Sequence, residues 1–330
     1  MKRSQMQLSS YKLSLEEEYC LRKIKADTEK WNVDNISRTK AYFSFFEKYP
    51  EISWAFLASM VSRNGGWNMC DLEGKWFPHA LPKQLRSLLF LTYERANWII
   101  FQDAYPQLLL YHYSTKMRRS MFHLLRFFCV SSFMEVEWKN YWLNRDGNRL
   151  VTSLIINEQN VIQKPVIEHP VFKKKVFHSL SYFFQDWFHF SSVIFPTVSG
   201  ELFGASVSGF TKLSNRIDLG KRLANILLSP NLYPYFFQFA KKTEHTGSRM
   251  DYEQYLYLGQ KRQRETPFLR TTYPIISHLL HEKKDWSKEG RVKKAWYKPI
   301  RHKHPILLTD WYLKKQSQMK TLIGIEELIK

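Results

Sequence analysis

The sequence predicts a mainly α-helical protein, an irregular multi-helix bundle with a basic, less regular C-terminal appendage. Through most of the 330-residue chain, apolar residues recur at the three- and four-residue spacing of amphipathic helices. Prolines and glycines punctuate these segments in place of the period-two alternation of half-buried strands. Because 44% of the residues are hydrophobic and 16% aromatic, an unfolded chain would expose too much ring surface to water, so the chain must fold.

The first predicted helix, Leu15–Trp31, carries acids in its first turn and lysines later, the arrangement that the helix dipole favours. The third, Ile52–Val61, is apolar on nearly every side, which indicates a helix buried within the bundle. Pro106 should break or kink the helical pattern that begins at Leu85. In chain order, the predicted helices are Leu15–Trp31, Ser37–Lys48, Ile52–Val61, Leu85–Tyr105, Gln107–Lys116, Arg119–Phe128, Glu135–Leu143, Leu150–Ile162, Phe172–Ile194, Ile217–Leu228, Tyr235–Lys242 and Asp251–Leu258.

The composition changes after Gly259, where helical patterns shorten, prolines return and basic residues crowd together. We therefore expect a helical core domain over residues 1–258 and a basic C-terminal segment over residues 259–330, packed on the core or extending from it. The clearest breaks within the core are Asn144–Asn148, Lys164–Pro170 and Ser199–Gly209.

The segment Val176–Phe195 has the length of a transmembrane helix and follows three lysines. Asp186 at its centre opposes insertion by about 2.5–3.5 kcal/mol, so we predict a buried aromatic helix and no transmembrane segment. The three cysteines, Cys20, Cys70 and Cys129, indicate neither a disulfide framework nor a cysteine-rich zinc site. With no secretory signal pattern, a cytoplasmic location is expected.

The segment Ser62–Leu72 combines a cation, amides, two adjacent glycines and a tryptophan. It follows the predicted buried helix, and a glycine at that place readily adopts the left-handed conformation that ends a helix, which is the favoured interpretation. The alternative is a ligand site in which bare backbone N–H groups approach an anion and a tryptophan forms a stacking wall. The residues assigned to that ligand site are Arg63, Asn64, Gly65, Gly66, Trp67 and Asn68.

On the predicted helix Leu85–Tyr105, several polar residues and one indole share a single arc about 160° wide. A solvated helix face is the favoured explanation, but the neighbouring Ile99–Phe101 is unusual on a wet surface and leaves a polar pocket as an alternative. If this face and Arg63–Asn68 line one cavity, they form an enzyme pocket with Glu94 as the candidate catalytic acid–base residue. The members of the arc are Glu94, Arg95, Asn97, Trp98 and Gln102, of which Asn97, Trp98 and Gln102 would bind the ligand.

Cofactor motifs are weak. Gly204–Gly209 has the two glycines of a phosphate-binding loop but not its lysine at the required spacing, so a flexible connection between helices is expected there. Histidine pairs such as His278 and His281 do not supply the three or four ligands that zinc or iron needs. We therefore expect no cofactor and no metal.

The formal net charge of +20 favours polyanionic partners, and it is concentrated near the C-terminal end. Between Lys283 and His304, nine basic residues stand against Asp285 and Glu289, with Trp286, Trp296 and Tyr297 interleaved. Such a segment binds phosphates and stacks on bases, or it is simply a solvated basic surface. The predicted polyanion-binding residues are Lys283, Lys284, Lys288, Arg291, Lys293, Lys294, Trp296, Lys298, Arg301 and Lys303.

Two stretches, Ser62–Met69 and Asn97–Leu108, resemble a family of uncharacterised proteins from Bacillus-type bacteria, the YppC-like proteins, described as a domain of unknown function. The resemblance covers chiefly Ile52–Tyr113. It implies a bacterial, cytoplasmic setting and no mechanism. Cys70 stands where we expect a small polar residue in the family, which argues against a catalytic role for this thiol.

These observations leave the biochemical function unknown. The leading hypothesis is a non-enzymatic, basic helical protein that binds a polyanion, with nucleic acid as the favoured partner. The second is the enzyme pocket around Glu94. The third is peripheral binding to the anionic inner leaflet of a membrane, with Trp286 and Trp296 as interfacial anchors. Substrate and oligomeric state do not follow from the sequence.

Overall fold

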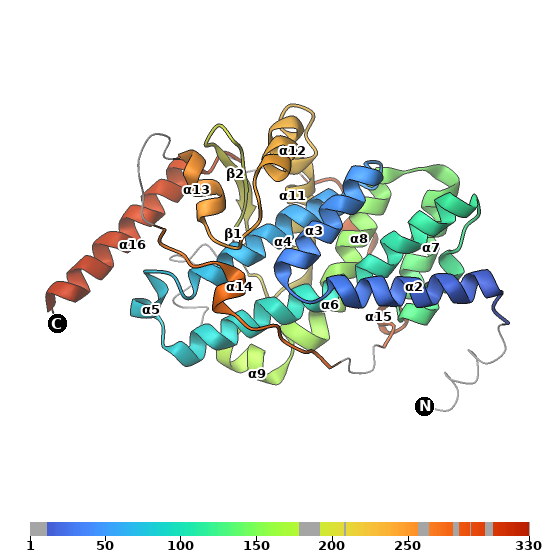
Figure 1. The fold of residues 1–330 in the computed structure, drawn as a ribbon, viewed down its shortest axis with the longest axis horizontal. Coiled ribbons are helices and arrows are strands. Elements are labelled where there is room, and N and C mark those ends of the chain that lie inside the picture. The colour runs from blue at the N-terminus through green and yellow to red at the C-terminus, as the bar shows by residue number, and fades with distance from the viewer. Residues whose placement is uncertain are drawn as a thin grey trace.

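The computed structural model describes residues 12–177, 192–207, 209–256, 264–279, 284–290, 292–300 and 306–329. These residues form the predicted mainly α-helical multi-helix fold, with one small sheet (Figure 1). The α-helices are α2 (Leu15–Trp31), α3 (Asn35–Lys48), α4 (Trp54–Asp71), α5 (Phe77–Ala80), α6 (Lys83–Met117), α7 (Ser132–Asn144), α8 (Gly147–Val161), α9 (Pro170–Phe172), α11 (Leu213–Leu227), α12 (Tyr233–Lys242), α13 (Met250–Leu256), α14 (Leu269–Thr272), α15 (Trp286–Glu289) and α16 (Thr309–Ile329). The other elements are the 3₁₀ helices η1 (Phe122–Phe128) and η5 (Lys294–Tyr297), the π-helices η2 (Gln163–Ile167) and η3 (Lys173–Phe177), and the strands β1 (Ser192–Pro196) and β2 (Leu202–Ser206).

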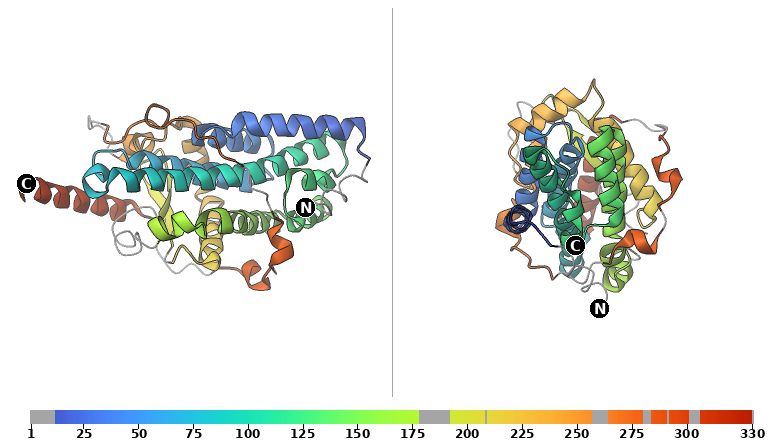
Figure 2. Two further views of the ribbon diagram at one scale, coloured as in Figure 1. Left: turned by 90° about the horizontal axis from the view of Figure 1, so that it is seen from below. Right: turned by 90° about the vertical axis from the view of Figure 1, so that its right-hand side faces the viewer.

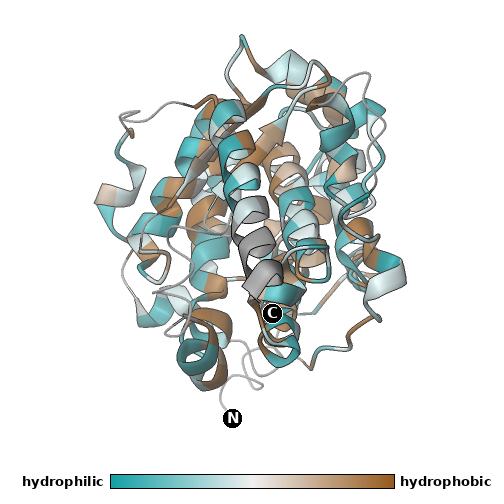
Figure 3. Ribbon diagram, turned by 90° about the vertical axis from the view of Figure 1, so that its left-hand side faces the viewer, coloured by the Kyte–Doolittle hydropathy of each residue, from teal (hydrophilic) through white to brown (hydrophobic). Residues whose placement is uncertain are grey.

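Helix α4 is the centre of the molecule. It contacts α3, α6, α8, α11 and β1, and its large apolar side chains Trp54, Phe56 and Met60 are 1% exposed or less. This confirms the buried helix predicted from its all-round apolar pattern. The surrounding helices carry hydrophilic and apolar faces on the same cylinder (Figure 3), as expected of elements that pack on a core with one side only.

Helix α2 has the predicted bounds, and α3, α7, α8, α11, α12 and α13 lie within a few residues of theirs. Two expected helices, Leu85–Tyr105 and Gln107–Lys116, are instead one continuous helix, α6, which runs beside α2 (Figure 2). The predicted break at Pro106 is therefore wrong. The lost backbone hydrogen bond is offset by burial on both sides of the proline, where Phe101, Tyr105 and Leu108 lie in the core.

The pair β1–β2 was not expected. The two strands are antiparallel, with Ile194 opposite Gly204, and the backbone N–H of Gly204 donates to the carbonyl of Ile306. A Cβ on Gly204 would lie 2.0 Å from the carbonyl oxygen of Val193, so only glycine permits this pairing. The helix predicted to end at Ile194 and the flexible connection predicted at Gly204–Gly209 are both wrong at these strands. The rest of the predicted helix Phe172–Ile194, including Asp186, lies outside the described residues beyond Phe177.

The described parts of the C-terminal segment pack against the helical core. The Trp286 indole donates to Asn157 on α8, and the backbone carbonyl of Trp296 accepts a 2.7 Å hydrogen bond from Lys221 on α11. Tyr312, on the first turn of α16, donates to Glu253 on α13, while the rest of α16 projects away from the body (Figures 1 and 2). The division of the chain into domains at residue 258 stays a prediction.

Within the described ranges, no helix combines the length and the apolar character that crossing a membrane requires. The cytoplasmic location stays a prediction.

Candidate functional site

Helix α4 presents two polar faces, both buried. The predicted helix end at Gly65 and Gly66 is wrong, because α4 continues through both glycines to Asp71. Because residues one helical turn apart share a face, residues 63, 67 and 71 all contact residues 240–253. Asn64, Gly65 and Asn68 lie on another face of the helix and border a cavity.

Gly66 remains helical because its missing side chain makes room for a crossing contact. A Cβ there would lie 2.5 Å from Asn35 Oδ1 and 2.7 Å from His245 Nε2. The glycine therefore serves a close approach between α3, α4 and the loop before α13 and does not present its N–H group to an anion.

The first face of α4 ties the helix to residues 240–251. Arg63 is 5% exposed and donates to the carbonyls of Ala240 and Thr243, which end α12. Burial lowers the pKa of Arg63 to about 10. The Trp67 indole donates to Asp251 Oδ2 at 2.9 Å. Arg63 and Trp67 therefore donate to groups of the protein itself and do not face a ligand.

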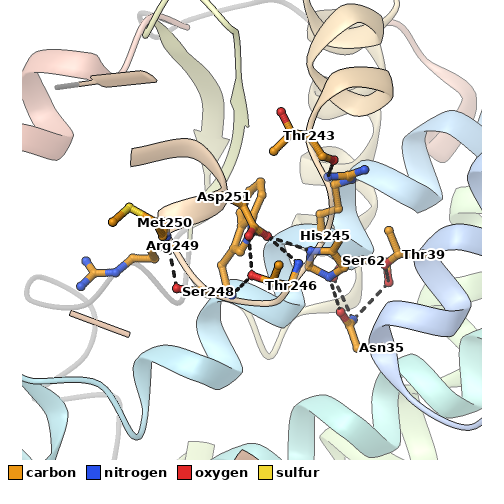
Figure 4. Close-up of polar contacts among 12 residues, drawn as sticks. Asn35, Thr39, Ser62, Thr243, His245, Thr246, Ser248, Arg249, Met250 and Asp251 are labelled. Atoms are coloured by element: carbon orange, nitrogen blue, oxygen red, sulfur yellow. Dashed lines mark hydrogen bonds and ion pairs between the residues drawn. The ribbon is translucent and has the colours of Figure 1, made fainter. Parts of the chain in front are cut away.

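His245 lies at the centre of this network, between Asp251 and Asn35 (Figure 4). Its Nδ1 is 3.2 Å from Asp251 Oδ2 and its Nε2 is 2.8 Å from Asn35 Oδ1, and Asn35 in turn donates to the carbonyl of Ser62. Burial lowers the pKa of His245. Burial acts to raise the pKa of Asp251, but hydrogen bonds from His245, Thr246 and Trp67 outweigh it and lower that pKa.

The end of this face holds a buried ion pair, in which Arg249 Nε lies 2.6 Å from Asp71 Oδ1. Burial raises the pKa of Asp71 to about 7, and the charge of Arg249 opposes that shift. Both side chains are at most 5% exposed, so this cluster is a structural contact with no opening for a substrate.

The second face of α4 borders a cavity of about 930 Å³ enclosed by α4, α6, α8, α11, η2 and β1. Most of its walls are aliphatic, which suits a largely apolar ligand. Its rim carries the exposed residues Glu168, Lys173, Phe210 and Thr211. The described aliphatic and aromatic lining residues are Tyr42, Leu57, Ala58, Val61, Leu89, Tyr93, Ala96, Ile100, Ile162, Val166, Ile167, Val176, Val193, Val207, Phe210, Leu219 and Leu223.

Among the described lining residues, one acid lies away from the exposed rim. Glu158, on α8, accepts a 3.1 Å hydrogen bond from the side chain of Gln159. Burial raises the pKa of Glu158 to about 7, although Gln159 and the Trp54 indole act to lower it. At neutral pH the carboxyl is therefore divided between its protonated and ionised forms, which is the condition for a proton donor or acceptor.

The two buried cations among the described cavity-lining residues are engaged by the protein. Arg38 is 1% exposed, and its Nη2 lies 2.5 Å from Glu94 Oε2. Arg216 is also 1% exposed and donates to backbone and side-chain oxygens of Gln159, Gln163 and residues 210–211. Burial lowers the pKa of Arg216 to about 10.

The structure divides the residues predicted as a ligand site. Asn64, Gly65, Asn68 and Asn97 line the cavity together, whereas Arg63, Gly66 and Trp67 lie on the opposite face of α4.

Of the remaining residues of the predicted α6 site, Glu94 and Gln102 face α3 and the end of α2, whereas Arg95 donates to a carbonyl of η2. Glu94 is 4% exposed and pairs with Arg38, while Asn32 donates to Gln102 Oε1 and to the carbonyl of Trp98. Glu94 therefore lies outside the cavity lining, and Glu158 is the acid within it.

Sequence reasoning missed Glu158. The available sign was an acid on the apolar stripe of α8, one turn after Leu154. Among the described residues, no three histidine, cysteine, aspartate or glutamate side chains come together as a metal ion would require.

The basic C-terminal segment is described in part. Of the residues predicted to bind a polyanion, Lys284, Lys288, Lys293, Lys294 and Lys298 are exposed, and Lys283, Arg291, Arg301 and Lys303 lie outside the described residues. Trp296 is 7% exposed, so its ring packs inward and is not available to stack on a base.

The nearby acids of this segment are occupied. Asp285 accepts hydrogen bonds from Ser132 and Ser287, and Glu289 pairs with Lys164. Glu289 also interacts with the charge of Lys284, whereas Lys288, Lys293, Lys294 and Lys298 form no ion pair within the described residues.

Comparison with known proteins gives relatives without a described activity. A family model described as "Protein of unknown function (DUF2515)" matches residues 30–312. The chain is 46% identical over 323 residues to an uncharacterized protein, YppC, of Bacillus subtilis (strain 168), a match that covers 96% of this chain and 100% of the relative. These matches confirm the resemblance seen in the sequence. No solved structure matches the chain.

Replacement of Gly66 by alanine should destabilise the protein by about 1–3 kcal/mol, because the new Cβ would overlap Asn35 and His245. Gly147→Ala is the matched control: it lies in the first turn of α8, where the nearest heavy atom to a new Cβ is 4.0 Å away. That variant should gain about 0.5–1 kcal/mol from helix propensity. Urea unfolding of both variants measures the difference, and equal shifts would contradict the crowding at Gly66.

Glu158→Gln should stabilise the protein at high pH only. Because the pKa of Glu158 is raised from 4.5 to about 7 on folding, ionisation reduces the free energy of unfolding as the pH rises through this range. The variant should match the wild type near pH 4.5 and exceed it by up to about 3 kcal/mol at pH 8. Urea unfolding at both pH values tests this, and a difference independent of pH would contradict the assignment.

Proposed function

Since the chain belongs to the DUF2515 family of proteins of unknown function, we propose its function from its geometry: it binds a small, largely apolar molecule in the cavity between α4, α6, α8 and α11. The observation that carries this proposal is the cavity itself. Its volume of about 930 Å³ falls within the range of small-molecule sites, where apolar walls surround a few polar groups that fix orientation.

The distribution of side chains along the cavity supports entry of a ligand from the exposed rim. Glu168, Lys173 and Thr211 are exposed there, whereas Glu158, Ser62 and Asn64 line the cavity from α8 and α4. A ligand that passes the rim leaves water and enters apolar surroundings, which favours its apolar part by about 25 cal/mol for each Å² buried.

Glu158 supports a functional role for the cavity on energetic grounds. A glutamine of nearly the same shape would avoid the cost of an ionisable acid in apolar surroundings. Acids held with a pKa near 7 in a cavity are typical of groups that bind or transfer protons.

A neutral fluorescent probe, N-phenyl-1-naphthylamine, should bind at one saturable site. Ala96→Phe directs a ring from α6 into the cavity and should weaken binding at least about tenfold by occupying the ligand's space. Ala80→Phe, on an exposed position of α5, should bind like the wild type. Fluorescence titration measures both, with thermal melts to confirm folding. Equal binding by the folded Ala96→Phe variant would contradict the proposal.

A second candidate function is polyanion binding, with nucleic acid as the favoured partner. The specific observation in its favour is the run of exposed lysines between Lys284 and Lys298, of which Lys288, Lys293, Lys294 and Lys298 form no ion pair within the described residues. Trp286 and Trp296 make inward contacts, which supports a binding mode based on phosphate neutralisation over one based on stacking or on insertion into a membrane.

Replacement of Lys288, Lys293, Lys294 and Lys298 by glutamine should flatten the salt dependence of DNA binding. For single-stranded DNA, four lost phosphate contacts reduce the slope of log K against log salt by about 3. Fluorescence anisotropy with a labelled oligonucleotide measures the slope. The matched control replaces the exposed Lys25, Lys30, Lys40 and Lys241 in the same way. Equal slopes for the two variants would remove the role of the C-terminal lysines.

A further inference from the structure

The charges that line the cavity favour one kind of ligand. Among its described lining residues, the ionisable side chains of either sign at neutral pH are Arg38, Glu158, Glu168, Lys173 and Arg216. Glu168 and Lys173 are exposed at the rim, where water screens them. The interior electrostatics therefore depend on Arg38, Arg216 and Glu158.

The two arginines have little to offer a ligand. Arg38 pairs with Glu94 and donates to Asn32, and its Nε is buried without a hydrogen-bond partner and out of reach of solvent. The guanidinium of Arg216 donates through Nε, Nη1 and Nη2 to five oxygens of the chain, among them Gln159 Oε1 at 3.0 Å. A guanidinium has five N–H groups, so Arg216 is saturated. Among the described residues that line the cavity interior, an anionic ligand would therefore find no cation without a partner in the protein.

Glu158 has capacity left. A carboxylate has about four sites that accept hydrogen bonds, and Gln159 occupies one of those of Glu158, with the Trp54 indole and the Tyr42 hydroxyl as further polar neighbours. It also borders open space, because it lines the cavity and is only partly buried. A donor carried by a ligand can therefore reach the carboxylate without displacing a protein contact.

We propose that the ligand is an amphiphile with a protonated amine, which pairs with the Glu158 carboxylate while its apolar part lies against the aliphatic walls. This inference rests on the proposed ligand-binding function. The pair neutralises an acid that burial otherwise holds partly protonated, and charge-assisted hydrogen bonds are about twice as strong as neutral ones. Asn64 and Asn68, from α4, and Asn97, from α6, border the same cavity and add polar contacts.

The test compares three probes that share one chain and differ in the head group: octylamine, 1-octanol and octanoate. Each is titrated at pH 8 against bound N-phenyl-1-naphthylamine. Octylamine should displace the dye at a concentration at least about tenfold below that of 1-octanol, and octanoate should be the weakest. Between pH 8 and pH 6 the preference for the amine should fall by about tenfold, because Glu158 must lose a proton to form the pair.

Glu158→Gln should abolish the preference for octylamine and leave 1-octanol unchanged, which also shows that the variant keeps its cavity. Glu47→Gln, at an exposed position of α3 outside the cavity, is the control and should preserve the preference. Equal displacement by octylamine and 1-octanol, or an unchanged preference in Glu158→Gln, would overturn this inference while the cavity stays a ligand site. Failure of all three probes and of the dye to bind would overturn the proposed function as well.

Discussion

Every polar side chain on α4 needs a partner inside the protein, because this helix is covered by α3, α6, α8, α11 and β1. Much of the architecture follows from that requirement. Asn64 bonds the free edge of β1, through the carbonyl of Ser192 and the N–H of Ile194, and Arg63 caps α12. Residues far apart in the chain are thus held at fixed positions around one central helix.

The two faces of α4 differ in whether they border open space, and this contrast separates structure from function. On the face of Trp67, the polar atoms of Asp251 and His245 are bound by neighbouring groups, and the surroundings are closed. On the other face, Glu158 combines open space with a pKa raised to about 7 by burial. A buried charged side chain does not by itself indicate a binding site. A charged side chain that borders a cavity does.

Local periodicity predicted the helices whose packing is one-sided, and α2 has the expected bounds because its cap, acidic first turn and apolar stripe agree. Local periodicity failed where contacts with residues distant in the sequence determine the structure. The sequence predicts a helix end at Gly66. The helix continues instead, because Asn35 and His245, from other parts of the chain, occupy the space where a side chain at this position would lie. In the same way, the cavity is assembled from four helices, so Asn64 and Asn97 were found while Glu158 was missed.

The small sheet is completed by a backbone segment that comes late in the sequence. Phe203 bridges to Leu307, and Leu202 accepts from the N–H of Leu308, so a strand pair formed in the middle of the chain receives its neighbour about a hundred residues later. During synthesis, β2 must wait with an unpaired edge until residues 306–308 leave the ribosome. Such a delay leaves hydrogen-bonding backbone groups of β2 without their final partner for as long as the last residues are being added.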